Sequence, residues 1–182
     1  MAEPVPHKNA QGAAIPNWVL VAAAAALVIG LAFAEQRRTA SEPAPKVALP
    51  VLGGDGATRG VEPGKVTLVD FWATWCGPCR VTMPKVQQIY RDYSPRGVDL
   101  LSVDTDNPGP DRDPTVREFL LQQGLTFPVV LDDGAGQDAF RISSLPTMLL
   151  VGKNGQVLWR HVGVLSASDD AGLRALMDRS LQ

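Results

Sequence analysis

The sequence predicts an α/β domain in which a mixed five-stranded sheet is flanked by helices. Within residues 51–182, β-branched and apolar runs alternate with helical patterns, which is typical of a sheet covered by helices. The last two predicted strands are separated by Gly152–Gly155, whose Asn-Gly pair is a strong hairpin signal. The sheet is therefore expected to end in an antiparallel pair.

A hydrophobic segment precedes this domain. Residues 1–17 form a leader, and Trp18–Ala34 is an unbroken apolar run of 17 residues, at the short end of what spans a bilayer as a helix. We expect a single transmembrane anchor here. The alternative is a signal peptide cut after Ala34, because Ala32-Phe33-Ala34 fits the small-x-small pattern of a cleavage site. In both cases the domain is expected outside the cytoplasm, on the periplasmic side.

The basic residues beside this segment favour the opposite orientation. Arg37 and Arg38 follow it, whereas Lys8 and the terminal amine precede it, and basic residues tend to stay cytoplasmic. Long domains are translocated largely regardless of charge, so export stays the expectation. Residues 35–50 are rich in proline, which favours extended, solvated backbone. This stretch is expected to be a linker between membrane and domain, and its composition fits a disordered tail equally well.

The elements of the domain follow from local patterns. One helix should run from Cys76 to Tyr93, and a second from Pro114 to Gln123, with Asp113 as N-cap and Gly124 as its stop. A final helix should begin after Ser166, which forms a capping box with the acidic residue three positions on. The predicted strands are Lys65–Phe71, Val98–Asp104, Phe127–Leu131, Thr147–Val151 and Gln156–His161.

Composition excludes several classes of function. The net charge is −2 and charged residues are spread along the chain, so no basic stripe points to nucleic acid. The two cysteines are too few for a four-thiolate zinc site, and a mixed site would need both His7 and His161 to converge on them. We expect no metal and no cofactor.

The cysteine pair carries the predicted chemistry. A strand runs through Trp72–Trp75 into Cys76-Gly77-Pro78-Cys79 at the start of a helix. Unpaired N–H groups and the positive end of the helix dipole lower the pKa of a thiol placed there. Cys76 is thus the predicted nucleophile, and Cys79, one turn further in, would attack the mixed disulfide from within. A structural disulfide or inert thiols would not need this placement.

The segment VDFWATWCGPCRVTMP resembles the active-site segment of the thioredoxin family, with Trp75, Cys76, Gly77, Pro78 and Cys79 forming WCGPC and Pro84 inside the helix. A second block, Ser144–Leu150 followed by Lys153-Asn154-Gly155, resembles the cis-proline loop and terminal hairpin of that family. The resemblance covers roughly residues 47–182 and implies a thioredoxin fold.

The resemblance also implies roles for single residues. Asp70 would be the buried carboxylate that accepts and returns the proton of Cys79, unless it merely solvates a strand end. Pro146 would have a cis bond that lets Leu145 pair with the backbone of a substrate. Gly163 would lie near the substrate groove or form a plain turn. Trp75 is expected at the surface, and Trp72 either there or in the core.

About forty residues separate Asp104 from Pro146, more than in minimal thioredoxin. An inserted helix and strand, with an N-terminal anchor, is similar to the TlpA/ResA-like branch of exported thioredoxins. That branch is implied to reduce disulfides in exported proteins, including apocytochromes, and to be recharged by an upstream thiol reductant. Two alternatives remain: a disulfide oxidant or isomerase, and a Cu(I)-binding assembly factor using both cysteines with Met83 nearby.

Overall fold

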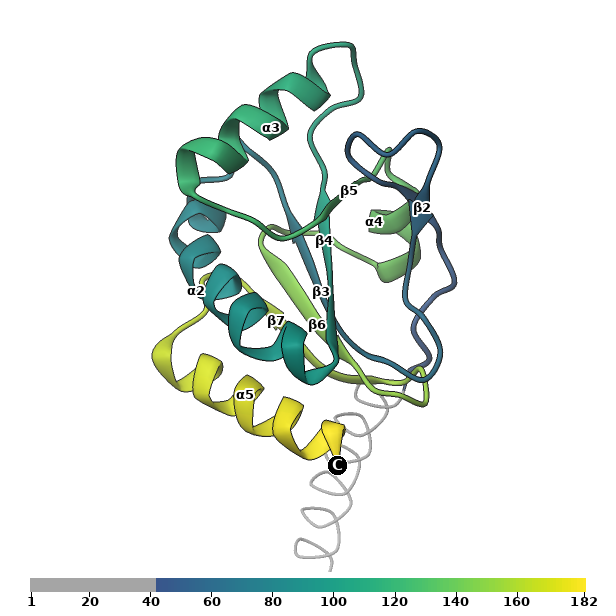
Figure 1. Ribbon diagram of the computed structural model, residues 1–182, viewed down its shortest axis with the longest axis vertical. Coiled ribbons are helices and arrows are strands. Elements are labelled where there is room, and N and C mark those ends of the chain that lie inside the picture. The colour runs from purple at the N-terminus through teal and green to yellow at the C-terminus, as the bar shows by residue number, and fades with distance from the viewer. Residues whose placement is uncertain (1–41) are drawn as a thin grey trace, which may run out of the picture. The chain divides into compact units, whose positions relative to one another are not determined.

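The computed structural model describes residues 42–182, whose chain order alternates strands and helices (Figure 1). A short 3-10 helix, Ser94–Arg96, follows the first helix. The elements are β1 (Leu49–Pro50), β2 (Thr58–Arg59), β3 (Val66–Trp72), α2 (Gly77–Tyr93), β4 (Val98–Asp104), α3 (Arg112–Gln123), β5 (Val129–Leu131), α4 (Ala135–Phe140), β6 (Thr147–Val151), β7 (Val157–Val162) and α5 (Ala167–Leu181).

Five strands form one mixed sheet in the order β5-β4-β3-β6-β7. The central strand β3 runs parallel to β4 and antiparallel to β6, while β6 and β7 form the predicted antiparallel hairpin. The fold class predicted from the sequence is confirmed for the described residues: an α/β sheet flanked by helices. Helix α2, which begins beside the two cysteines, follows the central strand β3 after a short loop.

Helices cover the two faces of the sheet unequally (Figure 1). Buried residues of α2, α3 and α5, such as Ile89, Phe119 and Leu173, form one core with every second residue of β3. The opposite face is covered by α4 and by the stretch around β1, through Phe140 and Leu49. Because side chains alternate along a strand, β3 contributes to both cores and is buried throughout.

Several predicted boundaries are corrected. Helix α3 begins at Arg112 with Asp111 as N-cap, so Asp113 lies in the first turn and Pro114 is not the first helical residue. The buried Arg112 is held by Asp104 at the end of β4, which brings the helix start closer to the sheet. Strand β5 is shorter than predicted because Pro128 has no N–H to donate to a ladder. The stop at Gly124 and the capping box of α5 are confirmed.

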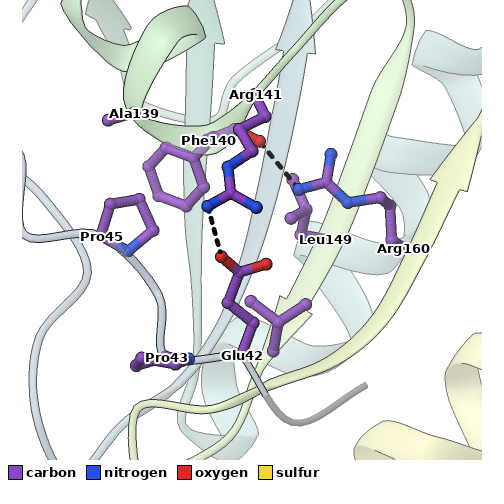
Figure 2. A pocket seen from close by; sticks show the side chains of 9 residues that line it. Glu42, Pro43, Pro45, Ala139, Phe140, Arg141, Leu149 and Arg160 are labelled. Carbon is purple, nitrogen blue, oxygen red and sulfur yellow. Dashed lines mark hydrogen bonds and ion pairs between the residues drawn. The ribbon is translucent and has the colours of Figure 1, made fainter. Parts of the chain in front are cut away.

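Residues 42–50, expected in the linker 35–50, run along the domain in the structure. Pro43 pairs with Gln156, and the amide of Val157 donates to the carbonyl of Glu42 at 2.8 Å. Figure 2 shows the Glu42 carboxylate pointing to Arg141, with the ion pair at 3.0 Å. Residues 42–50 therefore pack on the face of the sheet that α4 also covers.

The expected anchor at residues 18–34 and the leader lie outside the described residues. Within residues 42–182, no helix has the length and apolar character to cross a membrane.

Candidate active site

The cysteine pair lies where the central strand passes into α2. Cys76 is the N-cap of this helix, and Gly77 and Pro78 occupy its first turn, where a missing N–H leaves no gap in the hydrogen-bond ladder. The two cysteines form a disulfide with their Cα atoms 5.2 Å apart. The amide of Cys79 donates to Sγ of Cys76 at 3.2 Å. The same bond would stabilise a thiolate on Cys76 after reduction.

The two sulfurs differ in access. Both cysteines belong to the core beneath α2, but Cys76 is 4% exposed and lines a groove together with Trp75, Gly77 and Pro78, whereas Cys79 is 0% exposed and does not line it. A partner disulfide can therefore approach Cys76 from the groove, while Cys79 is reached only from the side of Cys76 and the interior. The order of attack expected from the sequence, with Cys76 first, stays a prediction.

Asp70 lies in β3, midway between Leu68 and Trp72, whose side chains pack in the core under α2. Because every second side chain of a strand points to the same face, the Asp70 side chain also lies on the face that α2 covers. Its side chain is 1% exposed, and neither carboxylate oxygen has a hydrogen-bond partner among residues 42–182. Burial raises the pKa of Asp70 to about 7. A carboxyl group with that pKa can hold or release a proton near neutral pH.

The loop before β6 lies against the groove. The Leu145–Pro146 peptide bond is cis, as the resemblance implied, and Leu145 is one of the groove residues. The amide of Gly163, which has a φ of 98°, donates to the carbonyl of Pro146 at 2.8 Å. Gly163 is therefore beside the cis-proline loop, at the end of edge strand β7.

The two tryptophans of the motif have different positions. Trp75 is 68% exposed and lines the groove. Trp72 is fully buried, stacks on Phe119 with ring centroids 5.3 Å apart, and donates from Nε1 to Oγ of Ser102 at 2.7 Å. The open alternative for Trp72 is thus settled in favour of the core, and the expected surface position of Trp75 is confirmed.

Part of the groove comes from segments without a sequence signal. Asn107 follows β4, Gln137 lies in the short helix α4, and Ile142 precedes the cis-proline loop. No motif marks these residues, because the fold brings them to the groove from three separate segments of the chain, two loops and helix α4. The groove lining contains no charged side chain. Within the described residues, no group of three or more His, Cys, Asp or Glu side chains is arranged to hold a metal ion.

Comparison with known proteins decides the family. The sequence pattern of the redoxin family matches residues 39–177, which is most of the chain. The chain belongs to the redoxin family. The resemblance to thioredoxins inferred from the two motifs is thereby confirmed, and the Cys76–Cys79 pair is the redox-active CxxC of this redoxin.

Curated relatives of this redoxin are thiol-disulfide oxidoreductases. The ResA protein of Halalkalibacterium halodurans is 34% identical over 125 residues, which are 68% of this chain and 69% of that protein. The ResA protein of Bacillus thuringiensis is 36% identical over 101 residues, covering 55% of this chain and 56% of that protein. The matches therefore span between about half and two thirds of the relatives. This redoxin is a thiol-disulfide oxidoreductase of the ResA type.

Solved structures agree with the redoxin fold. A structure described as a thiol:disulfide interchange protein DsbE from Chlorobium tepidum has a TM-score of 0.65 and 31% identity, over 78% of this chain and 97% of that one. StoA from Bacillus subtilis has a TM-score of 0.60 and 26% identity, over 73% of this chain and 98% of that one.

Proposed function

We propose that this oxidoreductase is a reductant of disulfides in exported proteins, held at a membrane by residues 18–34 and facing away from the cytoplasm. The observation that carries the proposal is the difference in burial between Cys76, which lines the groove, and Cys79, which is enclosed. The dipeptide Gly77-Pro78 supports the reducing direction, because thioredoxin, with a low potential near about −270 mV, is a reductant. The helix α3 and strand β5 would be the insertion expected of a ResA-like chain.

In the proposed reaction the Cys76 thiolate attacks one sulfur of a client disulfide. A bond forms between Sγ of Cys76 and that sulfur, the client S–S bond breaks, and the departing client thiolate takes a proton. Cys79 then attacks Sγ of Cys76, which forms the protein disulfide and releases the second client thiolate. The client gains two electrons and the oxidoreductase loses them. An upstream thiol reductant, entering through the same groove, would reverse the steps.

Asp70 is proposed to take the proton that Cys79 gives up before it attacks, directly or through water, and to return it on reduction. Its position under α2, its raised pKa and its two unpartnered oxygens support this role. A carboxylate already bound by several N–H groups would stay ionised and could not carry the proton. Asp70 has no such partners within residues 42–182.

The client segment is proposed to lie in the groove, with its backbone paired to Leu145 by strand addition. Gly77 and Pro78 form one wall and leave room for a client backbone near Cys76, since a Cβ added to Gly77 would meet no atom within 4 Å outside its chain neighbours and the backbone of its own helix. Trp75 would cover the client from the rim, and Pro146 with Gly163 would fix the opposite side.

The test is a redox titration of the full-length protein in a thiol buffer. Because the chain has only two cysteines, alkylation and intact mass report the fraction of reduced Cys76/Cys79 without ambiguity. A potential near about −270 mV is expected for a reductant. A potential near about −120 mV would instead assign an oxidant or isomerase, because the reduced pair would then be strongly stabilised.

A further inference from the structure

In the loop between β3 and α2, the amide, the hydroxyl and the carbonyl of Thr74 all form hydrogen bonds. Thr74 lies two positions before Cys76 and is 9% exposed. Its amide donates to Oδ1 of Asp106 at 2.9 Å, and its hydroxyl donates to Oδ2 of the same carboxylate at 2.5 Å. Its carbonyl accepts from Nε and Nη2 of Arg80 at 3.1 and 2.8 Å. Every polar group of Thr74 is thus paired.

Asp106 is itself fixed to the end of the sheet. Its amide donates to Oδ1 of Asp104 at 3.3 Å, and Nε of Arg112 donates to the same oxygen at 3.0 Å. Nη2 of Arg112 donates to the carbonyls of Asp104 and Asp132 at 2.6 and 2.9 Å, and Nη1 donates to Oδ1 of Asp133 at 2.8 Å. The side chains of Asp104, Asp106 and Arg112 are buried, so the carboxylate that holds Thr74 has a rigid support.

The two neighbours of Thr74 cannot hold the loop as firmly. Trp75 is 68% exposed, and Ala73, although buried in the core, has no polar side chain and forms its hydrogen bond through its carbonyl, which accepts from the amide of Cys76 at 3.2 Å. The position of Cys76 as N-cap, with its Sγ facing the amide of Cys79, therefore depends on where Thr74 is held. A looser Thr74 would let the helix start fray and weaken the bond to the sulfur.

We propose that Thr74 and Asp106 are positioning residues for the redox reaction, which hold Cys76 at the start of α2 so that the amide of Cys79 stabilises its thiolate. The pair acts through the loop and touches no client. This inference rests on the proposed attacking role of Cys76. It also gives α3 a function at the site, because Arg112 of that helix anchors the network.

The decisive variant is Thr74→Val in the full-length protein, because it removes the hydroxyl and keeps shape and charge. In the reduced variant we expect alkylation of Cys76 at pH 7 to slow by about fivefold, and its pH midpoint to rise. Thr74→Ser retains the hydroxyl and should restore both. The control is Thr115→Val, the same change at an exposed threonine of α3, whose hydroxyl donates to the carbonyl of Asp111 at 2.7 Å.

A Thr74→Val protein that folds and alkylates with the rate and midpoint of the wild type would overturn the proposal. If that variant does not fold, Asp106→Ala tests the same pair, because it removes both oxygens that accept from Thr74, with amide hydrogen exchange of Thr74 as readout. Exchange faster by about tenfold, together with slower disulfide reduction, is expected; unchanged exchange and turnover would refute the role. Mapping the alkylated cysteine in the wild type separates the two hypotheses, because first reaction at Cys79 would refute the proposed nucleophile instead.

Discussion

The amide of Cys79 donates a hydrogen bond of 3.2 Å to Sγ of Cys76, so the residue proposed to resolve the mixed disulfide also contacts the sulfur that begins the reaction. Its two contributions can be separated, because one comes from the backbone and the other from the thiol. A serine at position 79 keeps the N–H and removes the resolving sulfur.

Cys79→Ser is therefore expected to accumulate a covalent complex with a disulfide client, through Cys76. Cys76→Ser should form little or none, because the remaining sulfur is fully buried. Intact mass spectrometry under non-reducing conditions measures both adducts. An equal yield from the two variants would contradict the assignment of Cys76 as the attacking residue.

Asp70 predicts a pH dependence of stability. Burial raises its pKa to about 7 from an ordinary 3.8, so the folded protein binds this proton more tightly than the unfolded chain. Its contribution to the free energy of unfolding is fully present below about pH 4 and is lost as the pH rises through about 7. Relative to Asp70→Asn, the wild type should lose roughly 4 kcal/mol across this interval, by urea unfolding of the oxidised protein.

The comparison with Asp70→Asn is needed because a second buried carboxyl group, that of Asp104, titrates in the same pH range. Burial, together with the charge of Asp106, raises the pKa of Asp104 to about 6, and this effect is present in both proteins and cancels. Parallel stability curves would show that Asp70 does not titrate in this range.

We also expect Asp70→Asn to slow disulfide exchange several-fold at pH 7. An unchanged exchange rate would contradict the proposed role of Asp70 in proton transfer.

The two motif tryptophans should respond oppositely to truncation. Trp75→Ala is expected to change the free energy of unfolding by less than about 0.5 kcal/mol and to raise KM for a protein disulfide, because the ring is exposed at the groove. Trp72→Ala should lower the free energy of unfolding by about 3–5 kcal/mol, since it empties the core beside Phe119. Steady-state kinetics and urea unfolding check the pair. An unaltered KM for Trp75→Ala would exclude that ring from client binding.

Gly163 and Gly155 form a matched pair of left-handed glycines. Their φ values are 98° and 76°, and no atom lies within 4 Å of a Cβ added to either. Alanine at either position should cost about 1–2 kcal/mol of stability through backbone strain. Only Gly163→Ala should also slow client reduction, because Gly163 adjoins Pro146 whereas Gly155 lies in the distant hairpin. Equal activities of the two variants would argue against a role of Gly163 in the groove.

The sequence predicted best what local patterns encode. The strand that carries Asp70, the helix that starts at the cysteines and the terminal hairpin each follow from a continuous stretch, and β4 and β6 agree in both bounds. The sequence left open whether Trp72 lies in the core or at the surface. The answer depends on what covers each face of β3. That relation becomes visible only once the neighbouring strands are paired.

Other features depend on contacts distant in sequence. Helix α4 spans only Ala135–Phe140 and owes its start to the Asp132 carboxylate, which accepts from the amides of Gly136 and Gln137. Six residues are too few for a helical period, so no prediction was possible. The N-cap of α3 was misplaced for a related reason, since the pairing of Arg112 with Asp104 crosses the β4–α3 loop.

The stretch of residues 42–52 reaches both edge strands of the sheet. Glu42 and Pro43 pair beside the start of β7, and Val51 and Leu52 bond to Val130 and Val129 of β5. Unpaired sheet edges recruit strands from other molecules. A recombinant domain that begins at Gly53 would therefore be expected to self-associate more readily, whereas one that begins at Glu42 keeps the start of β7 and part of β5 paired. The choice of N-terminal limit thus bears on whether the isolated domain is obtained as a monomer.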